Sequence, residues 1–257
     1  MNFLHAFFIA ALLAATVAAD VPSRIAISEA TLTSIKPQSS EADQDYDRGV
    51  QFAEEGDYAV AAKFYRVAAE KGNVAAQYNL GNLYKKGLGV ERDLKRAATW
   101  YRKAASQGDA EAQNNLGTLY ATGGGVRRDD AEARRWYQLA AKQGNPEAMS
   151  NLGAMYLQGR SVKRDCFKAF QLFRKSAELG YGVAQNNLAL MYANGQAVAR
   201  DYVWAYAWLD MAAEQISGCK TLRDRIAIKM TRDDIQRART LAAVKREQIS
   251  QRAKESK

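Results

Sequence analysis

The chain has 257 residues, with 37 Lys and Arg against 28 Asp and Glu, so its formal net charge is +9. His5 is its single histidine, and Cys166 and Cys219 are its two cysteines. Downstream of His5 this composition excludes Cys-His dyads, most catalytic triads, and histidine-bearing or four-thiolate metal sites. We therefore expect no catalytic residues, no metal and no other cofactor.

The first nineteen residues are apolar and end in small residues, with Val17 and Ala19 placed as a signal peptidase requires. A transmembrane helix needs ~20 apolar residues, and this run is shorter. We expect residues 1–19 to be a secretory signal peptide that is cleaved, with an uncleaved anchor as the alternative. Cleavage would remove His5 and leave a periplasmic or secreted protein with no transmembrane span in the mature chain. Residues 20–42 show no helical period and hold two of the three prolines, which predicts a flexible linker.

The next part of the chain, residues 43–218, is a repeat. The segment "NLGNLYKKGLGVERD" begins at residue 79, and similar segments begin at residues 115, 151 and 187, each 36 residues after the one before. A copy near Asp43 has a connecting loop that is four residues shorter. The spacing predicts five units of about this length, the first one shorter.

Each unit is predicted to hold two helices that are separated by a glycine-containing loop. The first helix is expected to start after an N-cap side chain at Asn73, Asp109 or Asn145, and Pro146 suits the first helical position. Small residues within it let a neighbouring helix approach closely, at Gly81, Gly117, Gly153 and Ala189. The first helix is expected to end at glycines 87, 123, 159 and 195. The second is expected to be capped by aspartates 93, 129, 165 and 201 and to end at glycines 108, 144 and 180.

One of these loops, "YATGGGVRRDD" at residues 120–130, has three consecutive glycines and suggests a phosphate-binding loop. It lacks the Lys-Ser or Lys-Thr of a Walker motif, and its sister loops do not keep all the glycines. We interpret it as a turn in which Gly124 and Gly125 add flexibility that the sister loops do without.

The remaining residues, 219–257, follow a different pattern and carry most of the charge. Residues 220–257 contain 12 Lys and Arg against 5 Asp and Glu. Leu222, Ile226 and Met230 form one apolar stripe, and Thr231 with Asp234 predicts a capping box for a second helix. We expect a basic pair of helices that caps the repeat array.

The order of residues in "AQYNLGNLYKKGLGVERDLKRAATWYRKAASQG" and its copies resembles the Sel1-like repeat, a relative of the tetratricopeptide repeat. This resemblance implies an all-α fold: a right-handed α-solenoid of five helix-turn-helix repeats, four of them of 36 residues, with a C-terminal capping helix pair. It also implies that the first helices line a concave face that binds a partner. The residues expected on that face are Tyr46, Val50, Tyr78, Asn82, Lys85, Asn114, Thr118, Thr122, Ser150, Ala154, Gln158, Asn186, Leu190 and Asn194.

Two recurring polar positions allow alternative interpretations. Arginines 92, 128, 164 and 200 form either a basic ridge for an acidic partner or, as we favour, a ladder of Arg–Asp pairs between neighbouring units. Asparagines 79, 115, 151 and 187 are either ligand groups or, as we favour, bond a neighbouring backbone. Because Cys166 and Cys219 fall at opposite edges of the array, we expect them to be unpaired.

These features favour a function in binding. The leading hypothesis is an exported interaction scaffold or regulatory adaptor of the bacterial cell envelope, with another envelope protein as its partner. The alternative is a module that binds peptidoglycan or an anionic polysaccharide through the basic C-terminal region. A hydrolase of the β-lactamase type is a third, less favoured hypothesis, and nucleic acid is not expected as a partner because no reading motif is present.

Overall fold

The computed structural model describes residues 40–255 of the chain. These residues fall in the second of two compact units, Ser39–Lys257, and the first unit, Met1–Gln38, is outside the described residues. The predicted signal peptide, His5 and nearly all of the predicted linker therefore also lie outside them.

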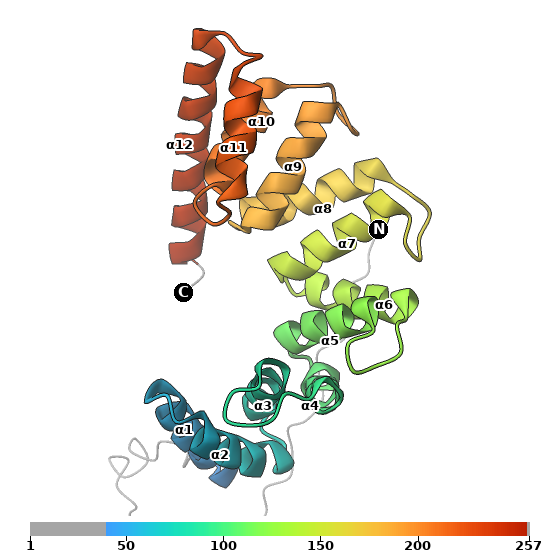
Figure 1. Cartoon of the computed structure of the whole chain (residues 1–257), viewed down its shortest axis with the longest axis vertical. Coiled ribbons are helices and arrows are strands. Elements are labelled where there is room, and N and C mark those ends of the chain that lie inside the picture. The colour runs from blue at the N-terminus through green and yellow to red at the C-terminus, as the bar shows by residue number, and fades with distance from the viewer. Residues whose placement is uncertain (1–39, 256–257) are drawn as a thin grey trace, which may run out of the picture. The chain divides into compact units, whose positions relative to one another are not determined.

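The described residues form twelve helices and no strands (Figure 1). The helices are α1 (Glu41–Glu54), α2 (Tyr58–Glu70), α3 (Val74–Lys86), α4 (Leu94–Ser106), α5 (Ala110–Thr122), α6 (Asp130–Lys142), α7 (Pro146–Gln158), α8 (Cys166–Glu178), α9 (Gly182–Asn194), α10 (Tyr202–Ala212), α11 (Gly218–Ala227) and α12 (Arg232–Glu255). None of them is long and apolar enough to cross a membrane.

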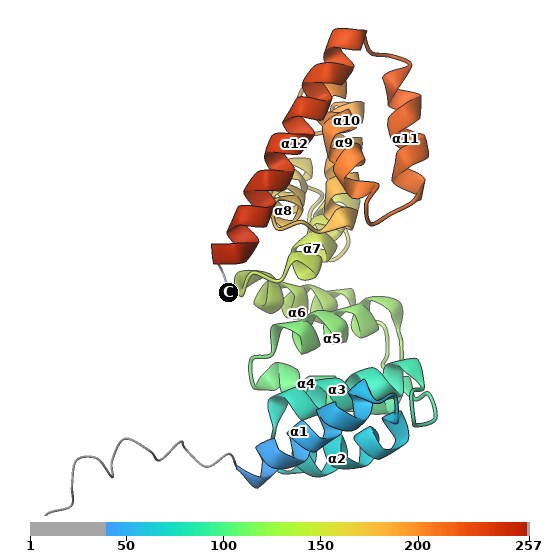
Figure 2. The same ribbon diagram turned by 90° about the vertical axis from the view of Figure 1, so that its left-hand side faces the viewer.

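The helices pair in sequence as hairpins, and each hairpin packs on the next one (Figures 1 and 2). Five hairpins, from α1/α2 to α9/α10, form the array, and α10 also packs against α11 and α12. This arrangement confirms the predicted all-α array of five helix-turn-helix repeats, whose stacking buries the faces that a single hairpin would expose.

The predicted capping residues begin and end the helices. The side chains of Asn73, Asp109 and Asn145 accept hydrogen bonds from the third helical N–H, at 2.8, 2.6 and 2.8 Å. Four aspartates do the same for the second helices: Asp93, Asp129, Asp165 and Asp201. The first helices α3, α5, α7 and α9 end at glycines in the left-handed conformation, with φ between 67° and 77°.

The glycines within the first helices allow close approach of the second helix of the same hairpin. A Cβ atom on Gly81 would lie 2.7 Å from the Tyr101 ring, and one on Gly117 would lie 2.8 Å from the Tyr137 ring. The same holds for Gly153, where the Phe173 ring would be 3.0 Å away. Real Cβ atoms do not tolerate such distances, so each aromatic ring requires the glycine that faces it.

The loop at residues 120–130 is a turn, as predicted, but Gly125 does more than add flexibility. Its φ is +72°, and a Cβ atom there would lie 2.2 Å from the backbone carbonyl carbon of Leu94 in the preceding hairpin. The equivalent residues of the sister loops, Gly89, Ser161 and Ala197, also have positive φ. The prediction was wrong here because the local sequence does not show that the loop touches the preceding unit.

Buried apolar side chains form two clusters that meet in α6. One cluster runs from Ala61 to Trp136, and the other runs from Ala133 to Ala242. The neighbouring residues Trp136 and Tyr137 belong to different clusters. The C-terminal helices complete the second cluster, since Ala238 and Ala242 of α12 are fully buried.

The predicted capping box at the start of α12 is present, because Thr231 Oγ1 accepts from Asp234 N at 3.1 Å and Thr231 N donates to Asp234 Oδ2 at 3.2 Å. Cys166 and Cys219 are both free thiols, as expected, and Cys219 is buried.

Candidate partner-binding surfaces

The predicted partner-binding residues lie one per turn along the first helices, and we call this stripe the first-helix face. Twelve of the fourteen are partly or well exposed. Asn114 and Ser150 are exceptions, with exposed fractions of 0% and 3%. Their prediction as surface residues was wrong, because both side chains are buried and leave no surface for a partner.

Tyrosines of the second helices reach through the hairpin to this face. The Tyr101 hydroxyl donates to Asn82 Oδ1 at 2.7 Å, and the Tyr137 hydroxyl donates to Thr118 Oγ1 at 3.2 Å. Burial raises the pKa of both tyrosines above the usual value, so both remain neutral donors. The polar groups of Asn82 and Thr118 are thereby fixed in place at the surface.

Two of the recurring asparagines, Asn115 and Asn151, bond side chains and not the neighbouring backbone. Asn115 Oδ1 accepts from Lys85 Nζ at 2.9 Å, and Asn151 Nδ2 donates to Asn114 Oδ1 at 3.0 Å. Both bonds join one first helix to the next along the array. The predicted backbone partner was wrong, because at these junctions the opposing first helix presents a side chain.

Two acidic residues that were not predicted for the first-helix face extend it by one helical turn. Glu111 and Glu147 stand three residues before Asn114 and Ser150, so the same helical spacing would have found them. Glu111 Oε1 accepts from Asn145 Nδ2 at 2.8 Å. Burial, followed by the nearby charges of Glu147 and Asp109, raises the Glu111 pKa above its usual value.

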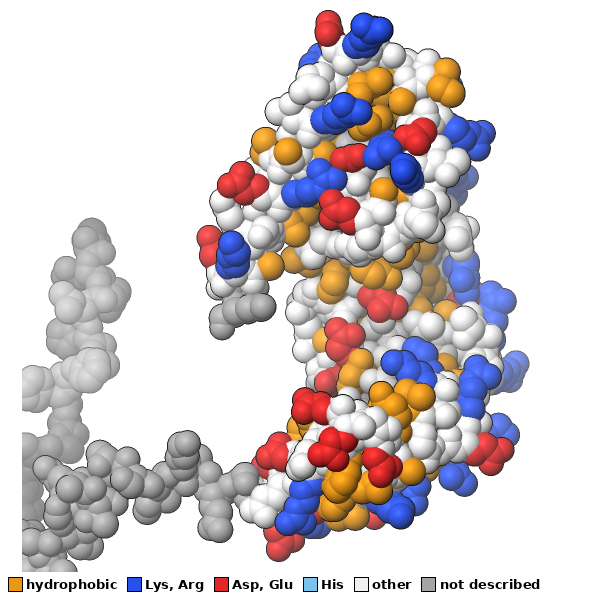
Figure 3. Space-filling model, turned by 60° about the vertical axis from the view of Figure 1, so that its left-hand side comes forward, with side chains coloured by type: hydrophobic (Ala, Val, Ile, Leu, Met, Phe, Trp, Pro, Cys, Tyr) orange, Lys and Arg blue, Asp and Glu red, His pale blue; other side chains and the backbone are white. Residues whose placement is uncertain are grey.

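Acidic side chains also gather on the hollowed side of the array in Figure 3, over its N-terminal half. In Figure 1, α3 and α5 lie to the left of α4 and α6, and the left side is the one that Figure 3 turns forward. The first-helix face of this half is therefore polar and carries negative charge. Lys85 is the one basic residue among the positions predicted for the face.

The expected Arg–Asp ladder does not form. Arg92 donates from Nε to the carbonyl of Lys85, Arg128 pairs with Asp130 of its own hairpin, and Arg200 lies over the Tyr202 ring. Among the described residues, the ion pair between neighbouring repeats in this loop region is instead Arg160 to Asp130, at 2.6 Å. Hydrogen bonds from Arg160 and Arg128 lower the Asp130 pKa to about 2.

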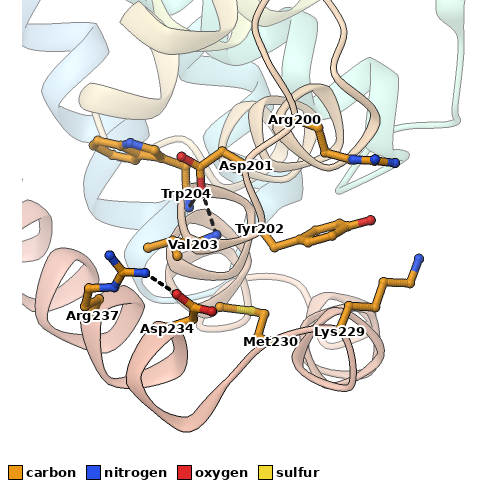
Figure 4. A pocket seen from close by; sticks show the side chains of 9 residues that line it. All are labelled: Arg200, Asp201, Tyr202, Val203, Trp204, Lys229, Met230, Asp234 and Arg237. Atoms are coloured by element: carbon orange, nitrogen blue, oxygen red, sulfur yellow. Dashed lines mark hydrogen bonds and ion pairs between the residues drawn. The ribbon is translucent and has the colours of Figure 1, made fainter.

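A pocket of about 390 Å³ lies where the last repeat meets the C-terminal helices (Figure 4). Arg200 and Lys229 both lie over the Tyr202 ring, with the charged groups 5.8 and 5.5 Å from its centre. Arg237, in contrast, is paired with Asp234. Within the described residues no carboxylate forms an ion pair with Arg200 or Lys229, so this pocket has two cations available to an anion.

Much of the remaining charge of the C-terminal helices is used within the fold. Asp210 of α10 binds Arg223 at 2.7 Å and Arg246 at 2.8 Å. Burial alone would raise the pKa of Asp210, but the hydrogen bonds from the two arginines outweigh it and lower the pKa. These ion pairs fasten α11 and α12 to the last repeat.

No group of three or more His, Cys, Asp or Glu side chains in residues 40–255 is placed to hold a metal ion. Ser217 and Lys220 have the spacing of the SxxK motif of β-lactamase-like hydrolases. Both side chains are exposed, and neither lines the pockets described here, so no enclosed site surrounds them.

Comparison with known proteins identifies the repeat. The family model described as "Sel1 repeat" matches residues 46–73, 74–109, 110–145, 146–181 and 182–217. No curated protein matches the chain.

Two of the solved structures that are similar to it share about a third of its sequence. A protective antigen of uropathogenic Escherichia coli, which has an SLR fold, is 34% identical with a TM-score of 0.75, over 83% of this chain and 48% of that one. A Sel1 repeat protein from Oxalobacter formigenes is 34% identical with a TM-score of 0.66, over 68% of this chain and 71% of that one. The chain thus spans about half the length of the Escherichia coli protein, and its five matched repeats show that it belongs to the Sel1 repeat family.

Proposed function

We propose that the chain is an exported interaction scaffold of the bacterial cell envelope that holds a basic segment of a partner protein on its first-helix face. The observation that carries this proposal is the crowding of acidic groups around Glu111. Burial, with a further contribution from the charges of Glu147 and Asp109, raises the Glu111 pKa, and a cation brought by a partner would stabilise the charged carboxylate.

The face also has the polar groups that a peptide backbone requires. Asn82 and Thr118 are partly exposed and are held by buried tyrosines, so a partner would not have to order them. Helical repeats present such a row of side chains to an extended segment or to a helix.

Export is part of the same proposal. The apolar residues 1–19 support it, and so does the similarity to a protein described as a protective antigen. A fusion of residues 1–19 to an export reporter tests it directly, and a reporter that stays in the cytoplasm would contradict it.

Photo-cross-linking in cells tests the binding face. A photo-reactive residue at Tyr78 or at Thr118 should capture the same partner protein, because both positions lie on the first-helix face. The same residue at Thr99, an exposed position on the second helix α4, is the matched control and should not capture it. Capture of no defined protein from the first-helix positions, or equal capture from Thr99, would refute the proposal.

Exchange of Glu111 and Glu147 for glutamine then tests the charge of the captured segment. We expect the double variant to bind the partner ~10-fold more weakly, because two charge-assisted contacts of ~0.5–1 kcal/mol each are lost. Glu132→Gln, on the second helix α6, is the control and should change the affinity less than twofold.

A second candidate function is the binding of an anionic polysaccharide, and the pocket of Figure 4 favours it. Arg200 and Lys229 are free for an anion, and the Tyr202 ring between them offers a surface on which a sugar stacks. Co-sedimentation with purified peptidoglycan should then fall steeply between low and high salt and be lost in the Arg200→Ala, Lys229→Ala variant. Binding that is independent of salt and of these two residues would count against it.

A further inference from the structure

One junction of the array departs from the repeat at several positions that lie close together. The fourth unit has Leu172 at a position that is tryptophan in three sister units, as Trp100, Trp136 and Trp208. The fourth unit also has Met149 at a position that is glutamine in three sister units, as Gln77, Gln113 and Gln185. The third unit has Gln138 at a position that is arginine in three other units, as Arg66, Arg102 and Arg174.

In three other units, the glutamine at the Met149 position forms hydrogen bonds where neighbouring units meet. Gln77, Gln113 and Gln185 each donate from Nε2 to an alanine carbonyl near the end of the preceding unit, at 3.1, 3.1 and 3.3 Å. At the junction of the third and fourth units Met149 holds this position and cannot form the bond. Within the second and third units the same glutamines also accept from Gln107 and Gln143, at 2.8 and 2.9 Å, whereas the equivalent residue of the fourth unit is Leu179. Leu179 is left 49% exposed.

The tyrosine at this junction also has a different neighbour. The guanidinium of Arg66 donates to the Tyr84 hydroxyl at 2.9 Å, and that of Arg102 donates to the Tyr120 hydroxyl at 2.9 Å. The equivalent pair here is Gln138 and Tyr156, and a glutamine side chain is shorter and uncharged. Lys168 lies over the Tyr156 ring at 4.4 Å from its centre, as the equivalent Arg96 lies over the Tyr84 ring at 5.5 Å.

These substitutions leave a groove of about 590 Å³ between α6 and α8, with α7 as its floor. Met149, Leu152, Tyr156 and Leu172 supply its apolar surface. Lys142, Lys168 and Lys175 are its charged residues, and the lining includes no acidic residue. In the described part of the chain none of the three lysines takes part in an ion pair. We call this surface the second-helix groove.

We propose that the second-helix groove binds a peptide segment that inserts one large aromatic side chain between acidic residues. The space opened by Leu172 in place of tryptophan suits an aromatic anchor, and burial of such a side chain supplies most of the free energy of binding. The three unpaired lysines select carboxylates on either side of that anchor. This site is separate from the first-helix face and selects the opposite charge.

Three short peptides with blocked ends test the proposal with the whole protein: Asp-Trp-Asp, Lys-Trp-Lys and Asp-Ala-Asp. Titration is followed by the chemical shifts of the backbone amides in a ¹⁵N-labelled sample. Asp-Trp-Asp should shift the amides that border the second-helix groove in a saturable way. The peptide with the opposite charge and the peptide without the anchor should each bind at least ~5-fold more weakly, since each lacks one of the two kinds of contact.

Leu172→Trp restores the residue of the sister units and fills the groove. It should weaken the binding of Asp-Trp-Asp by at least ~10-fold, because the anchor and the new indole would occupy the same space. The midpoint of urea unfolding should not fall, because the same residue is buried in the sister units as Trp136 and Trp208.

The paired exchange Lys168→Gln, Lys175→Gln tests the charge, and we expect it to weaken binding ~5-fold. Its matched control is Arg96→Gln, Lys103→Gln, which removes the equivalent charges from the unit that keeps Trp100. The control should change the affinity less than twofold. Shifts that map to another surface, equal binding of the three peptides, no binding of any of them, or full binding by Leu172→Trp would each overturn the proposal.

Discussion

The middle hairpins and the last hairpin solve the same packing problem with different pairs of residues. In α5/α6, Gly117 faces the ring of Tyr137, and in α9/α10 the equivalent residues are Ala189 and Leu209. Ala189 and Leu209 are both fully buried. The comparison shows that the two positions act as a pair: a methyl group is allowed in the first helix only where the second helix gives up the aromatic ring.

The loop that connects the two helices also differs between a middle hairpin and the last one. The third loop residue is Gly125 in one hairpin and Ala197 in the last one, and both have positive φ. A residue with a side chain adopts this conformation at a cost of ~1–2 kcal/mol. The last repeat therefore carries backbone strain, as does the fourth repeat at Ser161, whereas the second and third repeats have Gly89 and Gly125 at this position and avoid it.

The largest expected effect comes from Gly117→Ala. Its Cβ atom would lie 2.8 Å from the Tyr137 ring and 3.2 Å from the carbonyl oxygen of Ala133, so the helices must move apart. We expect the free energy of unfolding to fall by about 2–3 kcal/mol, as for other overpacked cores. Urea denaturation followed by circular dichroism measures it.

The matched change in the last hairpin is Ala189→Gly, which should cost only about 1 kcal/mol, the difference in helix propensity. In the double variant Gly117→Ala, Tyr137→Leu, the two effects should be less than additive by ~1 kcal/mol or more, because the pair then copies Ala189 and Leu209. Strict additivity would show that the two positions are not a pair.

The next effect concerns the ion pairs between the last hairpin and the C-terminal helices. Asp210→Asn should lower the free energy of unfolding by about 2 kcal/mol, because Arg223 and Arg246 lose their shared, partly buried counter-ion. Asp224→Asn is the control, because Asp224 is 57% exposed and its pair with Arg223 should contribute little. Equal effects of the two variants would contradict the role given to Asp210.

A smaller effect depends on pH and on the pair that joins the middle hairpins. The Asp130 pKa in the folded protein is about 2, below its ordinary value of 3.8. The pair therefore stabilises the fold fully above pH ~4, and the contribution is lost as the pH falls toward ~2. We expect a loss of about 1 kcal/mol, less than the shift alone implies, because Arg128 is 61% exposed.

Unfolding of the Asp130→Asn variant at pH 6 and at pH 3 measures this contribution. The difference in stability between the variant and the parent protein should shrink at the lower pH. A constant difference would show that the charge of Asp130 does not stabilise the fold.

The smallest effect is a gain in stability. Ala197→Gly should raise the free energy of unfolding by about 0.5–1 kcal/mol, since glycine adopts positive φ without strain but has more freedom in the unfolded chain. Ala199→Gly, two residues further along the same loop, should give no gain. A loss of stability in Ala197→Gly would show that the loop is not strained there.

The sequence predicted the helix ends, because these depend on residues that are close together in the chain. The caps at Asn145 and Asp129 and the stop at Gly123 follow from residues within a few positions of one another, and the 36-residue period then repeats them. The fold class and the order of the hairpins follow from that period.

The sequence did not predict contacts between neighbouring units. The loop arginine that reaches the adjacent hairpin is Arg160, which occurs in one loop only, and not the recurring Arg128. Asn114 and Ser150 have the helical spacing of the surface stripe, yet both are buried, and Asn151 of the next hairpin bonds Asn114. Periodicity places a residue on a side of its own helix, but it does not show how closely the next hairpin covers that side.

The division of the core within α6 bears on how the protein unfolds. Trp136 and Tyr137 contribute to separate apolar clusters, so the boundary between the two parts of the core falls within α6. The next junction also lacks a hydrogen bond of its neighbours, because Met149 stands where Gln113 and Gln185 donate to the preceding unit. Cooperativity in a repeat protein depends on the strength of such junctions. We therefore expect amide hydrogen exchange to reveal two blocks of protection that open with different free energies, separated near α6 and α7.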